Sequence, residues 1–106
     1  MSLKTSNFII IVALFGFPHI SVAATDRQFR DAISDSDDVS MYESIFLAAT
    51  KKLVSSGVCS LAEIQEYGGW VKSQNQKKKP VYFTYCGGMN VKNRIYLDAS
   101  SGKTFR

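Results

Sequence analysis

The chain has 106 residues, two cysteines and a formal net charge of +4. This length allows one small domain, near the size at which a hydrophobic core alone gives marginal stability. The only histidine is His19, close to the N-terminus. The rest of the chain therefore has no imidazole, which excludes Ser-His or Cys-His catalysis and histidine ligands for zinc.

Residues 1–24 have the three-part pattern of a secretory signal peptide. Lys4 supplies the positive charge, residues 8–17 form an apolar run, and residues 21–24 (SVAA) offer small side chains for cleavage after Ala23 or Ala24. A transmembrane anchor is the alternative, but the run is shorter than the roughly 20 residues that span a bilayer. We expect an exported protein, periplasmic rather than extracellular, with no transmembrane segment after cleavage.

Cleavage after Ala24 would leave 82 residues, with both cysteines but without the histidine. In an oxidising compartment Cys59 and Cys86 are predicted to form one disulfide, closing a loop of about 27 residues and stabilising the fold by about 3 kcal/mol. Two bonded cysteines cannot form a four-thiolate zinc site. The sequence predicts no metal, no cofactor and no enzymatic activity.

The mature part begins with an acidic lead segment, residues 25–39, which is expected to have at most one helical turn and to be mobile. Residues 25–50 carry six acidic and two basic side chains, a net charge of −4. Residues 51–106 carry ten basic and three acidic side chains, a net charge of +7. This asymmetry favours either self-complementarity or an anionic partner.

The packed domain is expected over residues 40–106 and starts with two helices. Apolar side chains from Tyr42 to Leu53 recur at helical spacing, which predicts a helix over residues 41–56 that begins with a Ser40/Glu43 capping box. A second capping box, Ser60/Glu63, predicts a shorter helix that ends before Gly68-Gly69. Cys59 falls in the joint between the two helices.

The remainder has the composition of β structure. Strands are predicted at residues 81–86 (VYFTYC), 94–98 (RIYLD) and 103–106 (KTFR), with a further short strand at residues 70–72. Helices followed by strands define an α+β fold. We therefore expect two N-terminal helices packed on a three- to four-stranded antiparallel sheet with one disulfide.

Three short patterns suggest chemistry but lack its context. Gly102-Lys103-Thr104 resembles the end of a phosphate-binding loop, but Leu97 stands where that loop needs its first glycine. Ser100 and Lys103 have the serine-lysine spacing of some hydrolases, but they flank a predicted turn. Asp35, Asp37 and Asp38 lack the further ligands of a calcium loop and fit a solvated acidic linker.

Strand alternation makes both faces of the sheet substantially apolar. A disulfide would turn Cys86 and Tyr82 toward the helices, but Val81 and Phe83 are the better core residues. With a bulge near Cys86, we expect Val81, Phe83, Ile95 and Leu97 to face the helices. Tyr82, Thr84, Arg94 and Tyr96 would then be exposed.

Basic and aromatic side chains dominate the second half and form the candidate contact surface. The predicted binding residues are Trp70, Lys77, Lys78, Lys79, Tyr82, Lys92, Arg94 and Tyr96. Core filling explains about half of the aromatic side chains equally well, and a solvated loop explains residues 77–79.

The leading hypothesis is a small exported binding protein such as an inhibitor, an immunity-type protein or an accessory subunit of an envelope assembly. Its partner would be another protein or, if the exposed face is covered by self-association, a second copy in a homodimer. The alternative is a module that binds an anionic polymer, such as nucleic acid or acidic glycan, or the lipid headgroups of a membrane surface. A small serine-lysine hydrolase is the third and least favoured hypothesis.

Overall fold

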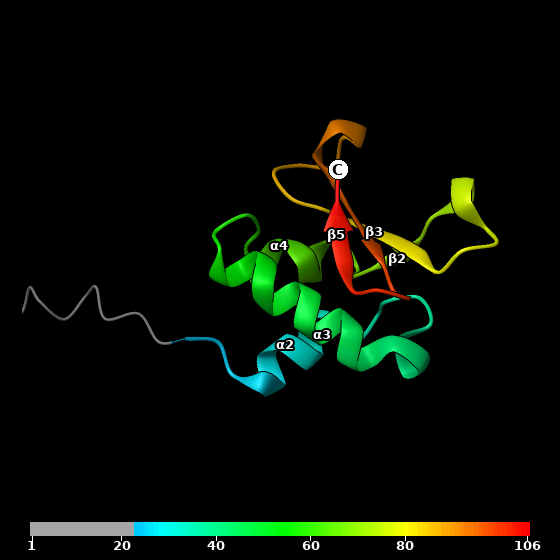
Figure 1. Ribbon diagram of the computed structural model, residues 1–106. Coiled ribbons are helices and arrows are strands. Elements are labelled where there is room, and N and C mark those ends of the chain that lie inside the picture. Colours follow the sequence, from blue (N-terminus) through cyan, green and yellow to red (C-terminus); the bar gives the residue numbers. More distant parts are fainter. Residues whose placement is uncertain (1–22) are drawn as a thin grey trace, which may run out of the picture.

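The computed structural model describes residues 23–106, so the expected signal peptide lies outside the described residues except for its last two positions. The described part is an α+β fold of helices followed by a sheet (Figure 1). Its helices are α2 (Asp26–Ala32), α3 (Val39–Ser55), α4 (Leu61–Glu66) and the 3-10 turns η3 (Gln74–Gln76) and η4 (Val91–Asn93). Its strands are β2 (Val71–Lys72), β3 (Val81–Tyr85), β4 (Arg94–Asp98) and β5 (Lys103–Phe105).

The four strands form one antiparallel sheet in the order β2-β3-β4-β5. Tyr82 is opposite Leu97 and Phe83 is opposite Tyr96 in the central pair. Tyr96 is in turn opposite Phe105 on the outer strand β5. Each strand pairs with the next along the chain, so the sheet needs only short connections.

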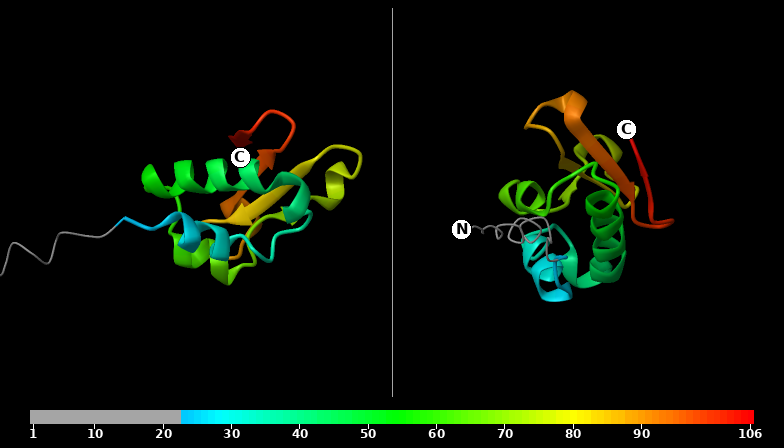
Figure 2. Two further views of the ribbon diagram at one scale, coloured as in Figure 1. Left: turned by 90° about the horizontal axis from the view of Figure 1, so that it is seen from below. Right: turned by 90° about the vertical axis from the view of Figure 1, so that its left-hand side faces the viewer.

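The helices lie together against one face of this sheet (Figures 1 and 2). The helix α2 contacts both α3 and α4, and α4 contacts β3. Phe46, Ala49 and Leu53 come from the apolar stripe of α3 and are buried. They pack with the helix-facing side chains of the sheet and with Ile64 of α4 in one core cluster.

The segment 25–39 is more ordered than its polar composition predicts. It forms the helix α2, which starts with a capping box in which Thr25 and Gln28 bond each other's backbone N–H groups. Phe29, Ala32 and Ile33 are buried. Three apolar side chains at helical spacing are enough to anchor this segment, so the expected boundary at residue 40 does not separate it from the packed fold.

Both predicted helices are present, but neither of the two predicted capping boxes forms in full. The helix α3 starts at Val39 after Asp38, which has left-handed backbone angles, so Ser40 lies inside the helix and does not cap it. In α4 the Ser60 hydroxyl accepts from the Glu63 N–H at 3.1 Å, as predicted. The Glu63 carboxylate instead accepts from the Gly87 N–H at 2.5 Å.

The predicted disulfide is present. Cys59 and Cys86 are bonded, with 5.1 Å between their Cα atoms, and both are buried. The bond joins the α3–α4 connection to the end of β3. It lies beside the Glu63–Gly87 hydrogen bond, so a covalent link and a polar link hold the same two segments together.

The predicted orientation of β3 is wrong. Tyr82 and Thr84 face the helices and are buried together with Ile95 and Leu97 opposite them. Val81 and Phe83 lie on the other face. The disulfide explains this orientation, because it turns Cys86 toward the helices and no bulge interrupts the alternation between Cys86 and Tyr82.

Candidate functional site: an aromatic row on the outer sheet face

A continuous row of aromatic rings crosses the sheet on the face opposite the helices, here called the outer face. Ring-centroid distances are 5.7 Å for Tyr67–Tyr85, 5.6 Å for Tyr85–Phe83, 6.1 Å for Phe83–Tyr96 and 5.4 Å for Tyr96–Phe105. Alternation along β3, β4 and β5 places four of these rings on one face, and Tyr67 follows directly after α4. We call these five residues the aromatic row.

Arg94 lies over the middle of the aromatic row. Its guanidinium carbon is 4.0 Å from the Phe83 ring centroid and 5.4 Å from that of Tyr85. Its Nε donates to the Tyr85 hydroxyl at 3.1 Å, and its Nη1 makes a longer contact of 3.5 Å with the Tyr96 hydroxyl. Two tyrosines and one phenylalanine therefore hold the guanidinium in a defined orientation.

The charge of Arg94 has no acidic partner within the described residues. Among residues 23–106 the ion pair observed is Lys51–Asp26, at 2.7 Å, which links α3 to α2. The guanidinium of an arginine is protonated at every physiological pH, and the hydrogen bonds to Tyr96 and Tyr85 raise the pKa of Arg94 further. The outer face thus carries a fixed, half-buried positive charge.

Two of the predicted binding residues are in the core instead of on the surface. Trp70 is fully buried, and its Nε1 donates to the Thr50 hydroxyl at 3.0 Å. Tyr82 is 1% exposed, and its hydroxyl donates to Asp38. Both side chains are buried and their polar groups are bonded to other residues of the protein, so neither belongs to an exposed contact surface.

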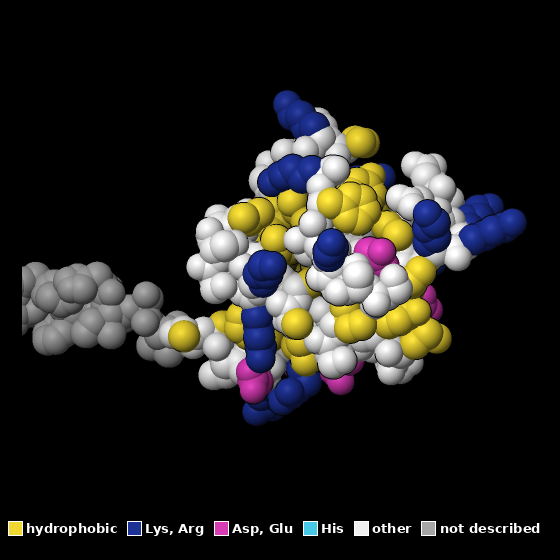
Figure 3. Space-filling model, viewed as in Figure 1, with side chains coloured by type: hydrophobic (Ala, Val, Ile, Leu, Met, Phe, Trp, Pro, Cys, Tyr) yellow, Lys and Arg dark blue, Asp and Glu magenta, His cyan; other side chains and the backbone are white. Residues whose placement is uncertain are grey.

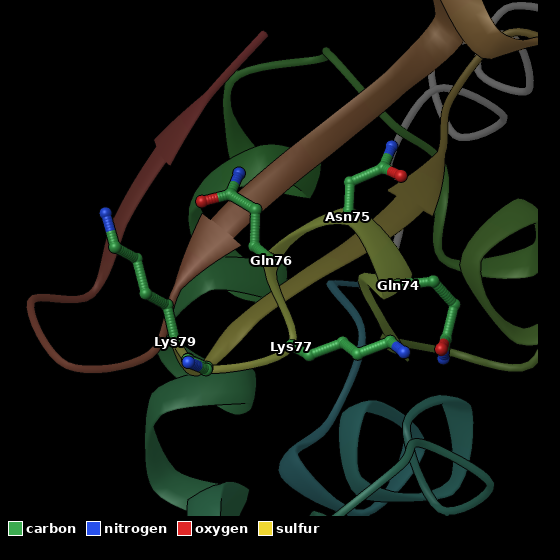
Figure 4. Close-up of a pocket in the computed structure, with 6 residues that line it drawn as sticks. Gln74, Asn75, Gln76, Lys77 and Lys79 are labelled. Carbon is green, nitrogen blue, oxygen red and sulfur yellow. The ribbon is translucent and has the colours of Figure 1, made fainter.

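Lys77, Lys78 and Lys79 are exposed on the loop between η3 and β3, as expected. With Gln74, Asn75 and Gln76 they line a shallow cavity of about 420 Å³. Figure 4 shows that the side chains of Lys77 and Lys79 point in different directions. The ammonium groups of Lys77 and Lys79 therefore do not converge on one anion.

A lysine that sequence reasoning did not single out shapes this loop. The ammonium of Lys72 donates to the backbone carbonyls of Lys79 at 2.8 Å and Gln76 at 3.0 Å, with longer contacts to those of Ser73 and Lys77. The loop closes around this one cation. Lys72 is thus occupied by the backbone and is not presented to a ligand.

The basic residues of the second half lie at two ends of the sheet. Lys79 precedes β3 beside Val81, whereas Arg94 is paired with Tyr85 at the other end of that strand. Lys92 is exposed in η4, two residues before Arg94. The structure therefore brings Arg94 and Tyr96 together and leaves residues 77–79 at the other end of β3, and Lys92 is a sequence neighbour without a contact to either group.

The ring geometry determines what the outer face can contact. The pairs Tyr67–Tyr85 and Tyr85–Phe83 meet edge-to-face, at 72° and 82°, so this part of the row is not a flat platform on which bases or sugars stack. Tyr96 and Phe105 at the other end are nearly parallel, at 17°. Phe105, at the end of the row, is 42% exposed. Figure 3 shows hydrophobic side chains around β5 with Lys and Arg side chains among them.

The motifs that suggested other chemistry do not form a sheltered site. The Ser100 hydroxyl donates to the Asp98 carboxylate at 2.6 Å, and Ser100 and Lys103 are both exposed on the β4–β5 hairpin. This hydrogen bond from Ser100 lowers the pKa of Asp98. Asp37 and Asp38 bond protein groups: the Asp37 carboxylate accepts from the Lys72 N–H at 2.7 Å.

No group of three or more potential metal ligands occurs within residues 23–106. In the same range no helix combines the length and the apolar character needed to span a bilayer. No protein-family model, curated protein or solved structure matches the chain. The candidate site consequently has to be interpreted from its own geometry.

Sequence reasoning identified Arg94 and Tyr96 but missed their neighbours Phe83, Tyr85 and Phe105 as members of the same surface. The signal in the sequence was the face of β3 on which the disulfide places Cys86. Had the disulfide been given more weight than the apolar character of Phe83, the alternation would have placed Phe83 and Tyr85 beside Arg94.

Proposed function

We propose that this chain is an exported, non-enzymatic binding protein that contacts a protein partner through the aromatic row and Arg94. The single observation that carries the proposal is the Arg94 guanidinium, fixed over Phe83 between two tyrosine hydroxyls on the face that the helices leave open. Tyrosine, phenylalanine and arginine are the residue types enriched at protein interfaces. Export to an oxidising compartment, with the periplasm preferred, is part of the proposal and is supported by the disulfide.

Binding of an anionic polymer is the second candidate, and the exposed lysines of residues 77–79 favour it. Two features favour the protein interface over this second candidate. The side chains of Lys77 and Lys79 diverge, and residues 77–79 lie at the opposite end of β3 from Arg94. The rings of Tyr67, Tyr85 and Phe83 meet edge-to-face, so the nearly parallel pair Tyr96–Phe105 is not extended into the longer stacking surface that single-stranded nucleic acids use.

Affinity capture with matched surface variants tests the proposal. The disulfide-bonded protein is immobilised and exposed to the envelope fraction and culture fluid of its own cells, and retained proteins are identified by mass spectrometry. Phe105→Glu places a charge at the exposed end of the aromatic row and should abolish capture. Lys78→Ala is the matched control and should retain it.

The salt dependence of capture separates the two candidates. A protein interface should give one-to-one capture that changes little between 50 and 200 mM salt, whereas a polyanion site with several phosphate contacts would weaken by roughly 10³-fold or more over that range. Capture lost on Lys78→Ala but kept on Phe105→Glu would overturn the proposal in favour of the polyanion. If nothing is retained and the protein sediments as a tight dimer, the aromatic row belongs to self-association.

A further inference from the structure

We propose that Arg94 with the hydroxyls of Tyr85 and Tyr96 forms a carboxylate receptor, which takes an Asp or Glu side chain or a chain-terminal carboxylate of the protein partner. This inference rests on the proposed function for the identity of the partner. The receptor itself is defined by three side chains of this chain. We call them the Arg94 receptor.

The Arg94 receptor has unused hydrogen-bond donors but few acceptors. A guanidinium has five N–H donors, and the contacts to Tyr85 and Tyr96 use two of them. Each tyrosine oxygen accepts from Arg94, so each hydroxyl proton remains to be donated elsewhere. A ligand at this point would meet guanidinium N–H groups and two O–H groups, which is the complement of an anion.

The position of the Arg94 guanidinium favours ligand binding and does more than cover the Phe83 ring. The guanidinium carbon lies 4.0 Å from the Phe83 ring centroid, a cation–π contact that holds the group without neutralising its charge. The side chain is half-buried, so it is partly removed from water yet still reachable. Holding the guanidinium before binding reduces the side-chain entropy that a partner would otherwise have to overcome.

Charge and shape favour a carboxylate over a phosphate. The receptor supplies one cation with a planar fork, which matches the planar, singly charged carboxylate. A phosphate group of a polymer is better served by several converging cations, and the lysines of residues 77–79 lie at the other end of β3. Lys92 is nearby in sequence but extends from η4 into solvent.

The Arg94 receptor can be tested without knowing the partner, using acetate as the probe. The full disulfide-bonded chain is labelled with ¹⁵N, and the Nε–H signal of Arg94 is assigned by its loss in Arg94→Lys. Sodium acetate is titrated against sodium chloride at constant ionic strength and neutral pH. We expect a saturable shift of the Arg94 signal with acetate and none with chloride.

Two variants separate the receptor from a general charge effect. The double variant Tyr85→Phe/Tyr96→Phe keeps both rings and the arginine but removes both hydroxyls, and it should weaken acetate binding by about tenfold or more. Lys78→Ala should leave the acetate response unchanged. Backbone amide spectra of each variant establish that the fold is retained. If the double variant does not fold, the single variants Tyr85→Phe and Tyr96→Phe replace it. Each is expected to weaken acetate binding severalfold.

The outcomes distinguish this inference from the proposed function. An identical response to acetate and chloride, or tighter binding of methyl phosphate than of acetate, would overturn the carboxylate receptor. If capture is unaffected by Arg94→Lys but lost on Phe105→Glu, the receptor is wrong and the protein interface rests on the aromatic row alone. If acetate binds as expected but no partner is captured, the receptor stands and the proposed function fails.

Discussion

The Tyr82 hydroxyl donates a 2.6 Å hydrogen bond to the carboxylate of Asp38, 44 residues earlier in the chain. Asp38 immediately precedes α3 and has a φ of 55°, a left-handed conformation that aspartate tolerates better than most residues. Tyr82 lies on the central strand β3, with its ring against Phe46 and Tyr42. The bond therefore anchors the start of the longest helix to the middle of the sheet.

Removing this hydroxyl should destabilise the fold. Tyr82→Phe keeps the ring packing but removes the part-buried hydrogen bond to the charged Asp38 carboxylate, so the free energy of unfolding should fall by about 1–2 kcal/mol. Urea denaturation of the oxidised protein at neutral pH measures this. Tyr96→Phe, which removes a half-exposed hydroxyl, should change the value by less than about 0.5 kcal/mol. Equal effects of the two substitutions would contradict the anchoring role.

The same pair predicts a loss of stability in alkali. Burial and the hydrogen bond to Asp38 raise the pKa of Tyr82 well above the ordinary tyrosine value of about 10. Above about pH 10, the ordinary tyrosine pKa, the unfolded chain releases this proton while the folded chain retains it. The contribution of Tyr82 to the free energy of unfolding is therefore complete below about pH 10 and declines as the pH rises further.

Unfolding free energies measured between pH 8 and pH 11 check the sign of this effect. The wild type should lose stability more steeply above pH 10 than Tyr82→Phe does. Parallel curves for the two proteins would show that Tyr82 does not titrate differently in the folded and unfolded states.

Gly69 should be far less replaceable than its neighbour Gly68. Both have positive φ angles, of 76° and 84°, so alanine costs about 1 kcal/mol or more at either position. A Cβ at Gly69 would in addition collide with the Ser36 hydroxyl oxygen and approach the Ile33 Cα to 3.2 Å, whereas Gly68 faces open space. The Ser36 oxygen cannot move aside without losing the hydrogen bond from the Trp70 N–H.

Gly69→Ala should therefore lower the free energy of unfolding by about 3 kcal/mol, against about 1 kcal/mol for Gly68→Ala. Thermal and urea unfolding of the two variants give the comparison. A Gly69→Ala protein as stable as Gly68→Ala would mean that residues 33–36 do not pack against the start of β2 as described.

Thr84 is a position where the natural residue is not the most stabilising one. Its side chain is buried among the helix-facing residues of the sheet, and its hydroxyl has no hydrogen-bond partner among the described residues. Thr84→Val keeps the shape and removes the unsatisfied polar atom, so stability should rise by about 1 kcal/mol. The control is Thr50→Val, which removes the acceptor of the Trp70 indole and should destabilise by about 1–2 kcal/mol. A lower melting temperature for Thr84→Val would contradict this assignment.

The helices α3 and α4 and the three longer strands were predictable because each carries a local signal. Apolar spacing from Phe46 to Leu53 identifies the helix, and Ser60 identifies the start of the next. The helix α2 was missed although Thr25 and Gln28 have the capping-box spacing. A polar, acidic composition suggested a mobile segment, but burial of Phe29 and Ile33 outweighs the exposed charges.

The candidate site was only partly predictable. Arg94 and Tyr96 were identified as surface residues from the alternation of β4. Trp70 and Tyr82 were assigned to the surface in error, because composition does not reveal that Thr50 and Asp38 satisfy their polar groups inside the fold. A contact between residues 20 or 44 positions apart depends on packing and leaves no local pattern.

The sequence by itself determined the class of fold and the disulfide. Apolar spacing and helix caps are local patterns, and two cysteines allow only one pairing within the chain. The tertiary structure alone decided which face of the sheet is open. Both faces of β3 are apolar, so hydrophobicity could not choose between them, and the covalent bond at Cys86 fixed the orientation. That choice places Phe83 and Tyr85 on the outer face, where Phe83 is buried beneath Arg94 and Tyr85 is half-buried.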